Sequence, residues 1–524
     1  MSQTTTTPSE PIVKLINHFA TPYNNAVATA RTCYSSKVIY AEDCDKDEKS
    51  RNLRDKIAES IYQAGHHTTI QHSTFQFALE HVSRQFIWAF LHSHTFYNSE
   101  QVSQRYVAVK PGSCWIPPLE GKALEVYESI ANYQMETYTR LNELLKPTTI
   151  EAYAKVFPNR NPEEDKWTRV LKKKTQEVAR YILPVATYAH LYHTISGLTL
   201  HRYNKLIHEF DTPYEQKLVV EKMIGAVNDV DPLFFKNIED SIPLEETQEY
   251  KVFAQFQEAR SQKSSEAFIN EFDEAMGDNF SVLIDYKQNA EETMATAVRA
   301  VLGLPKEKIS AEQAIELVMD PSQNALYKEA LNLTSHSKLT RTMLHPHFSF
   351  RKKISHTADS QDQRHRMTPG SRPIFITHFL RDKVDFMTPE LINHNSEAQK
   401  LYVEAHEKTW EGIRTLLDMG VSEEFATYLL PNSFPIRFVE SGDLLNFHHK
   451  WVHRLCYTAQ EEIWRSCLDE VNQVEKVQPL LVKYINPPCH IRFSSKVRPI
   501  CPEGDRFCGT PVWKLDKKDF ERVI

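Results

Sequence analysis

The segment Glu177-Val-Ala-Arg-Tyr-Ile-Leu-Pro184 returns later in the chain as Glu424-Phe-Ala-Thr-Tyr-Leu-Leu-Pro431. A second pair joins Phe75-Gln-Phe77 to Phe348-Ser-Phe350, again in the same order along the chain. Repeats that keep their order indicate a duplicated domain rather than a chance match. The repeats therefore predict two related halves, at residues 12–235 and 240–480, followed by a tail at 481–524 that is rich in Pro and Cys.

Length and composition limit the class of protein. The chain has 524 residues, more than one hydrophobic core usually serves, so two domains are expected. It carries 62 Lys and Arg against 69 Asp and Glu, which disfavours a broad nucleic-acid-binding surface. The opening MSQTTTTPSE lacks the pattern of an export signal, and no apolar run approaches the ~18 residues of a membrane span. We expect a cytoplasmic protein with reduced cysteines and neither a membrane nor a nucleic acid as partner.

Periodicity predicts a helix-rich α+β fold. Helical spacing of apolar residues extends over 124–145, 165–206 and 397–417, whereas short alternating runs are fewer. Glycine is scarce, with 13 in all, and no glycine-rich phosphate-binding loop is present. A bound phosphate would therefore be held by side chains.

The two halves differ sharply in one corresponding segment. The second half reads Ser355-His-Thr-Ala-Asp-Ser-Gln-Asp-Gln-Arg-His-Arg-Met367, almost without apolar residues, and it should not pack as a core helix. Gln361 lies one helical turn before Arg364, and the run Arg364-His-Arg366 suits a phosphate or a developing anion. The alternative is a solvated helix face. The first half reads Val82-Ser-Arg-Gln-Phe-Ile-Trp-Ala-Phe-Leu-His-Ser-His94, whose large apolar side chains would fill the same pocket.

Two further polar stretches lie in the first half. Gln101-Val-Ser-Gln-Arg-Tyr-Val107 sets a hydroxyl and a guanidinium two residues apart, which suits a phosphate or a base edge, although the motif alone favours an ordinary loop-to-strand turn. Gly65-His-His-Thr-Thr-Ile-Gln-His72 is rich in imidazole, and either zinc binding or stacking on a flat ligand fits the run. No serine or cysteine nucleophile stands in a recognisable motif, so chemistry carried by a cofactor is favoured.

The tail contains four potential metal ligands at irregular spacing: Cys489, His490, Cys501 and Cys508. A structural zinc site and a small cap with reduced cysteines are both consistent with this pattern.

Several of these motifs resemble the flavin-dependent thymidylate synthase family. The resemblance spans about 12–475 and rests on Gly65-His-His-Thr, Ser83-Arg84, Ser103-Gln-Arg-Tyr106, Ala179-Arg-Tyr-Ile-Leu-Pro184 and Arg364-His-Arg366. In that family an Arg-His-Arg helix end is followed by a Ser-x-Arg-Tyr loop. Here each half keeps only part of this set.

The losses divide between the halves in a regular way. The first half keeps Ser103, Arg105 and Arg180 but has His92-Ser-His94 where Arg-His-Arg belongs. The second half keeps Gln361, Arg364-His-Arg366 and a late arginine, Arg454, but has Thr427 in place of the other arginine. Because family enzymes build each nucleotide site from two subunits, the resemblance implies one complete composite site in a fused pseudo-dimer.

The resemblance implies an FAD-dependent enzyme that converts dUMP to dTMP with methylenetetrahydrofolate and NADPH. Arg454 would be catalytic. The implied dUMP-binding residues are Gln101, Ser103, Gln104, Arg105, Arg180, Gln361 and Arg364. The implied flavin-binding residues are His66, Thr68, Arg364, His365, Arg366, Asp443 and His449. A homodimer of chains is expected. The alternatives are a non-catalytic nucleotide-binding relic of the fold and a flavin-dependent methylase of another uracil compound.

Overall fold

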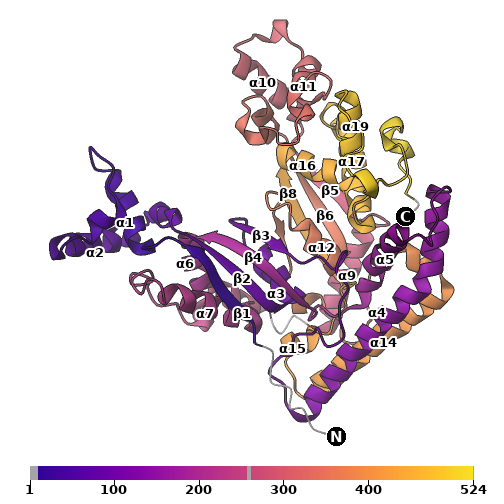
Figure 1. The fold of residues 1–524 in the computed structure, drawn as a ribbon, viewed down its shortest axis with the longest axis horizontal. Coiled ribbons are helices and arrows are strands. Elements are labelled where there is room, and N and C mark those ends of the chain that lie inside the picture. Colours follow the sequence, from indigo (N-terminus) through magenta and orange to yellow (C-terminus); the bar gives the residue numbers. More distant parts are fainter. Residues whose placement is uncertain (1–9, 257–260, 523–524) are drawn as a thin grey trace. The chain divides into compact units, whose positions relative to one another are not determined.

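A computed structural model describes residues 10–256 and 261–522 (Figure 1). The chain divides into two compact units. Unit 1 comprises the residues up to Asn132 together with Pro184–Ser264 and Thr415–Leu429, and unit 2 comprises Tyr133–Leu183, Ser265–Arg414 and the chain from Leu430 onward. Each unit thus contains a segment from the other half of the sequence.

Each unit is built on a four-stranded antiparallel sheet. In unit 1 the strand order is β1-β2-β4-β3, with β1 at Ile12–His18, β2 at Thr74–Ser83, β3 at Tyr97–Gln101 and β4 at Tyr188–Ser196. In unit 2 it is β5-β6-β8-β7, with β5 at Ser281–Tyr286, β6 at His347–Ser355, β7 at Gly370–Ser371 and β8 at Pro435–Asp443. The identical strand order agrees with the repeat in the sequence, and the helix-rich α+β prediction is confirmed.

Helices make up most of the remaining structure. The α-helices are α1 (Pro22–Thr32), α2 (Glu48–Gln63), α3 (Arg84–His92), α4 (Gly121–Val156), α5 (Asp165–Ala179), α6 (Gly197–Leu206), α7 (Tyr214–Asn228), α8 (Gln248–Gln255), α9 (Gln262–Met276), α10 (Ala290–Leu302), α11 (Ala311–Met319), α12 (His356–Asp362), α13 (Glu390–Asn393), α14 (Ser396–Asp418), α15 (Glu423–Thr427), α16 (Leu444–Arg454), α17 (Glu461–Val477), α18 (Pro479–Val482) and α19 (Pro488–Ser494). Short 3-10 helices join several of them, among them η2 (His67–His72) and η3 (Arg180–Ile182).

One predicted helix is partly wrong. The stretch 165–206 contains α5, η3, strand β4 and α6 rather than a continuous helix. In β4 the odd-numbered residues Ala189, Leu191, His193 and Ile195 are buried and the residues between them are more exposed, as a half-covered strand requires. The predictions at 124–145 and 397–417 are confirmed, since they fall inside α4 and α14.

The segments that each unit takes from the other half of the sequence, residues 133–183 in unit 2 and 415–429 in unit 1, are called the exchanged segments. They are bound to the rest of their unit by equivalent hydrogen bonds. In unit 2, the amides of Asn432 and Ser433 donate to the carbonyls of Leu183 and Tyr181 at 2.8 and 2.9 Å. In unit 1, the amide of Ala186 donates to the carbonyl of Tyr428 at 3.0 Å. These backbone hydrogen bonds anchor the repeated Tyr-x-Leu-Pro segments within the two cores.

A buried glutamate stands at the corresponding place in each core. Glu215 accepts hydrogen bonds from the Ser83 amide (2.6 Å), the Ser83 hydroxyl (2.5 Å) and the Tyr428 hydroxyl (3.2 Å) in unit 1. Glu462 accepts from the Ser355 amide, from the Ser355 hydroxyl at 2.6 Å and from the Tyr181 hydroxyl at 2.5 Å in unit 2. Each carboxyl therefore links the start of a helix to an exchanged segment.

Within the described residues, no helix is long and apolar enough to cross a membrane.

Candidate active site

Two capped helices carry the predicted residues of the second half. Ser355 ends β6 and its hydroxyl accepts from the Ala358 amide at the start of α12. Asp443 ends β8 and its carboxylate accepts from the Asn446 amide at the start of α16. Because β6 and β8 are antiparallel neighbours, α12 and α16 begin at opposite ends of the strand pair. Their far ends meet over the sheet, where both contact the same buried charges.

These charges form a cluster of two lysines and three carboxylates, which we call the buried charge cluster: Lys352 (β6), Asp362 (α12), Glu440 (β8), Lys450 (α16) and Glu470 (α17). The Lys352 ammonium lies 2.9 Å from Asp362, 3.1 Å from Glu440 and 2.9 Å from Glu470. The Lys450 ammonium lies 2.8 Å from Asp362 and 2.7 Å from Glu440. No side chain of the five is more than 1% exposed.

Asp362 and Lys352 of the buried charge cluster have pKa values that favour their charged forms. Burial opposes ionisation of Asp362, but the ammonium groups of Lys352 and Lys450 outweigh it and hold the pKa of this carboxyl well below its ordinary value. Burial likewise opposes the charge on Lys352, but Asp362, Glu440 and Glu470 raise its pKa well above the ordinary value. The cluster thus combines three carboxyl groups with two amino groups in a place that water does not reach.

Four predicted residues converge above the buried charge cluster. The Arg454 guanidinium donates from Nη2 to the Gln361 carbonyl at 2.9 Å, which ties the end of α16 to the end of α12. The rings of His365 and His449 are in a T-shaped contact, the edge of one toward the face of the other, with centroids 5.8 Å apart. Burial, and then the positive charge of Arg454, lowers the pKa of both imidazoles. Both rings are consequently neutral at neutral pH, beside a permanently charged arginine.

The other predicted residues of unit 2 each have their own set of neighbours. Arg180, on η3, is 3% exposed and its Nε donates to the Glu177 carbonyl at 3.1 Å, while Asn432 donates to the Arg180 carbonyl at 3.0 Å. Arg364 is exposed and Arg366 is half-buried. The carboxylate of Asp443 caps α16 and also accepts from the Asn446 side chain at 2.8 Å.

The predicted residues of the first half lie in unit 1. Gln101 ends β3 and accepts from Arg84 at 2.9 Å, and Gln104 is buried. The Ser103 hydroxyl accepts from the Arg105 amide at 3.3 Å, and the Arg105 guanidinium lies 5.5 Å from the ring centre of Tyr106. His66 and Thr68 are exposed at the start of η2.

Helix α3 fills its pocket as predicted. Phe86, Ile87 and Phe90 are fully buried, and Trp88 and Leu91 are nearly so. By contrast, the expectation that the polar segment 355–367 would not pack in a core is wrong for residues 355–363, whereas residues 364–367 are exposed or half-buried. Helix α12 is buried along almost its whole length, which also excludes the solvated-face alternative for these residues. Two sets of ion pairs make this burial possible: Asp362 meets two ammonium groups of the buried charge cluster, and Asp359 pairs with Arg372 at 2.7 Å.

The buried charge cluster itself was missed by sequence reasoning. One signal was available: β6 alternates Phe348, Phe350, Lys352 and Ile354 on its core face, so Lys352 occupies a core position. Its three partners come from α12, β8 and α17 and cannot be paired with it from local spacing.

The tail cysteines are partly buried thiols near a fourth one. Burial, then the proximity of Cys456, Cys501 and Cys508, raises the pKa of the Cys489 thiol to about 12. Cys456 therefore belongs with this group, although it lies 33 residues before Cys489 in the sequence. Among the described residues, no set of three or more His, Cys, Asp and Glu side chains is placed to hold a metal ion, so neither zinc hypothesis gains support.

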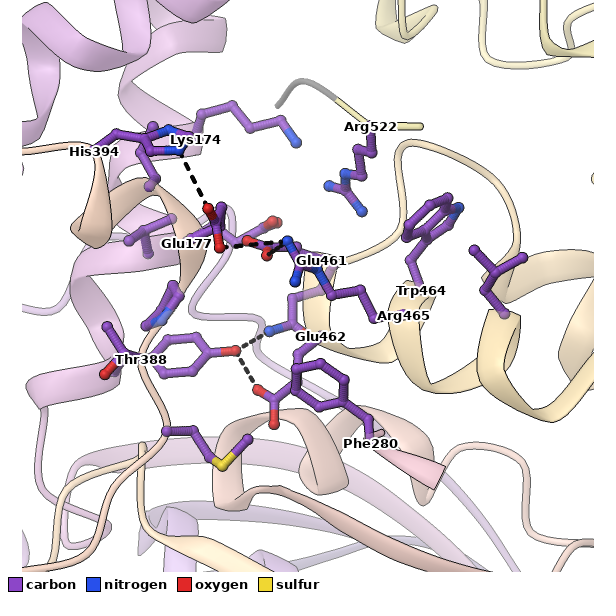
Figure 2. A pocket seen from close by; sticks show the side chains of 18 of the residues that line it. Lys174, Glu177, Phe280, Thr388, His394, Glu461, Glu462, Trp464, Arg465 and Arg522 are labelled. Carbon is purple, nitrogen blue, oxygen red and sulfur yellow. Dashed lines mark hydrogen bonds and ion pairs between the residues drawn. The ribbon is translucent and has the colours of Figure 1, made fainter. Parts of the chain in front are cut away.

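Unit 2 also contains a cavity of about 610 Å³, and Figure 2 shows side chains that line it. Tyr181, Glu461, Trp464 and Arg465 are among the residues that line it, and the described lining contains no predicted site residue. Arg465 pairs with Glu461 at 3.1 Å, and Tyr181 is held by Glu462 and Gln460. We therefore place the candidate active site at the ends of α12 and α16, where donors converge, rather than in this cavity.

Comparison with known families and proteins agrees with the resemblance seen in the sequence. The family model described as "Thymidylate synthase complementing protein" matches residues 14–233 and 282–480, one stretch in each half of the chain. The two matches together cover most of the chain.

Curated relatives are similar at 25 to 30% identity. The flavin-dependent thymidylate synthase of Clostridium tetani is 27% identical over 247 residues, which is 43% of this chain and 92% of that protein. That of Geobacter sulfurreducens is 25% identical over 235 residues, with the same coverage. The match to that of Saccharolobus solfataricus is 30% identical over 141 residues and spans only about half of that protein, 53%. The chain therefore belongs to the thymidylate synthase complementing protein family, the family of the flavin-dependent thymidylate synthases.

Proposed function

We propose that this protein is an FAD-dependent thymidylate synthase that converts dUMP to dTMP with methylenetetrahydrofolate and NADPH. One observation supports this most strongly. Arg454 and Gln361 are joined at 2.9 Å where α16 meets α12, beside the facing rings of His365 and His449. Membership of the family, whose model matches both halves of the chain, and the similarity to its flavin-dependent thymidylate synthases support the same reaction.

The donor chemistry of this region fits the groups that the reaction requires. Arg364, Arg366 and Arg454 carry guanidinium groups, which bind phosphates, pyrophosphates and carbonyl oxygens through charge-assisted hydrogen bonds. The neutral His365 and His449 offer flat faces and one ring donor each. Arg364, His365, Arg366 and His449, with Asp443 nearby in the chain, would hold the flavin, which supplies the hydride that completes the methyl group.

The remaining steps fall to the residues of the protein itself. Arg454 would polarise a uracil carbonyl and stabilise the negative charge that develops on it. Gln361 would orient the base through its side-chain amide, and Arg180 and Arg364 would bind the nucleotide. No protein nucleophile is needed, in agreement with the absence of a nucleophile motif in the sequence.

The proposal also assigns residues of unit 1 to the same nucleotide, on the strength of the family resemblance. Ser103 would lie near the uracil, with Gln101, Gln104 and Arg105 on the nucleotide. Thr68 and His66 would contact the flavin.

The test is the visible spectrum of the purified protein with and without dUMP, followed by anaerobic addition of NADPH and an assay of thymidylate formation. We expect bound flavin that is bleached by NADPH, and thymidylate formation that needs dUMP and the folate. Arg454→Ala should lower the rate about 100- to 1,000-fold, as the loss of one donor to a developing anion does.

Arg465→Ala is the matched control, because Arg465 is also an arginine on a helix of unit 2 but lines the cavity of Figure 2. It should retain near-normal activity. A protein that takes up no flavin even with dUMP present would contradict the proposal and favour the nucleotide-binding relic.

A further inference from the structure

The five positions of the buried charge cluster have equivalents in unit 1 that are also buried but carry uncharged side chains. Lys352 of unit 2 is paired across the sheet with Phe438, and Leu79 of unit 1 occupies the equivalent position, paired with Leu191. In the same way, Glu440 is paired with Phe350 in unit 2, and its equivalent His193 is paired with Phe77 in unit 1. The other three positions are equivalent because each lies at the same distance along the chain from a residue that the two units share. Asp362 follows the helix cap Ser355 as Phe90 follows the cap Ser83, and Lys450 follows the cap Asp443 as Tyr203 follows the cap Ser196. Glu470 follows the buried Glu462 as Met223 follows the buried Glu215.

In unit 1 the five equivalent side chains form an uncharged core. The ring of Phe90 lies 4.9 Å from that of His193 and 4.6 Å from that of Tyr203. The Tyr203 hydroxyl hydrogen-bonds His193 at 3.0 Å, and Leu79 and Met223 are fully buried in the same core. The fold therefore packs these positions without ions, and buried ion pairs can often be replaced by apolar side chains without loss of stability.

We propose that the buried charge cluster is a positioning device that holds Arg454 against the end of α12, so that its five residues set the geometry of the active site without touching substrate. The inference rests on the proposed function for its kinetic readout. Lys450 lies one helical turn before Arg454 on α16, and Asp362 directly follows Gln361 on α12. The contact between Lys450 and Asp362 at 2.8 Å therefore ties together the two helix ends that carry Arg454 and Gln361.

The charge of the cluster suits this role. Its carboxyl groups contact both ammonium groups, and Asp362 lies two residues before the Arg364-His-Arg366 segment and acts electrostatically on His365. An ion pair that water does not reach is stronger than an exposed one, so the pairing of Lys450 with Asp362 can hold the two helix ends together. The uncharged core of unit 1 has no ion pair between helices at the equivalent positions, which are Phe90, Tyr203 and Met223.

The first test replaces the five residues of the buried charge cluster with their uncharged equivalents from unit 1. The full-length variant carries Lys352→Leu, Asp362→Phe, Glu440→His, Lys450→Tyr and Glu470→Met. A second variant, Lys450→Met with Glu440→Gln, removes one charge of each sign and keeps the side-chain shapes close, in case the first does not fold. In either folded variant we expect kcat to fall about 100-fold, the effect of a misplacement of about 1 Å, with little change in KM for dUMP.

The matched control is a second ion network in unit 2, on the opposite face of the same strand. Lys353 and Arg437 both lie 2.8 Å or closer to Asp273, and no member of this network lies on α12 or α16. Lys353→Met with Asp273→Asn also removes one charge of each sign, and it should leave kcat unchanged. An unchanged kcat in a folded cluster variant, or an equal fall in the control, would overturn the positioning role.

A crystal structure separates this inference from the proposed function. If the unmodified protein forms no thymidylate, the proposed function fails, but the Arg454 to Gln361 contact still decides the role of the buried charge cluster. Loss of the 2.9 Å contact in the Lys450→Met, Glu440→Gln variant, with retention in the control, supports positioning. Retention in both overturns it.

Discussion

Glu215 illustrates how a single buried carboxyl can make the stability of a large protein depend on pH. Burial, opposed by its hydrogen bonds from Ser83, raises the pKa of this carboxyl to about 8 from an ordinary value of 4.5. The folded state therefore binds this proton more tightly than the unfolded state does. The contribution of Glu215 to stability is fully present below pH 4.5 and is lost as pH rises to about 8.

We expect Glu215→Gln to remove this dependence, because an amide makes similar hydrogen bonds without a proton to lose. The midpoint of thermal unfolding of the unmodified protein should fall relative to that of the variant as pH rises from 4.5 to 8. Comparison at each pH cancels the titration of all other groups. Parallel profiles across this range would show that Glu215 is not held protonated.

At the scale of the element, the short helix α12 depends on its cap. The Ser355 hydroxyl accepts from the Ala358 amide at 3.1 Å and donates to Glu462 at 2.6 Å. Ser355→Ala should cost about 1 kcal/mol or more of stability, because it removes the cap and leaves Glu462 short of a donor. Since α12 carries Gln361, thymidylate formation should also fall.

Ser83→Ala is the control for this prediction, because Ser83 caps α3 and donates to Glu215 in the same way but α3 carries no assigned residue. Chemical denaturation and the activity assay together give the comparison. Similar losses of stability with unequal losses of activity are expected. An equal loss of activity in Ser83→Ala would contradict the assignment of the site to α12.

Much of the fold at this scale follows from local patterns, whereas the support of the site does not. Apolar periodicity predicts α4 and α14, and the paired Phe-x-Phe runs indicate the equivalence of β2 and β6. Periodicity fails at β4, where alternating burial begins directly after a helix. It fails again at α12, because the partners that let Asp362 be buried lie in β6 and α16. A local sequence pattern predicts that a charged residue is exposed to solvent, even where a distant segment of the chain supplies the partner that allows it to be buried.

At the scale of the whole molecule, neither half of the sequence contains a complete unit. Unit 2 needs residues 133–183 and unit 1 needs residues 415–429. We therefore expect fragments 1–240 and 241–524 to be insoluble or poorly folded when each is expressed alone, because each core then lacks an element. Co-expressed fragments should purify together and give the circular dichroism of the intact chain. Independent folding of either fragment would contradict this expectation.

The exchanged segment 415–429 also bears on how the protein emerges from the ribosome. Unit 1 contains the first strand of the chain, yet its core lacks Tyr428 until that residue has been synthesised. Translation from Ser264 to Leu429 takes on the order of 10 s, far longer than a helix or hairpin needs to form. During this interval the nascent chain exposes the surface around Glu215 that Tyr428 later covers, so we expect this protein to depend on chaperones during its synthesis.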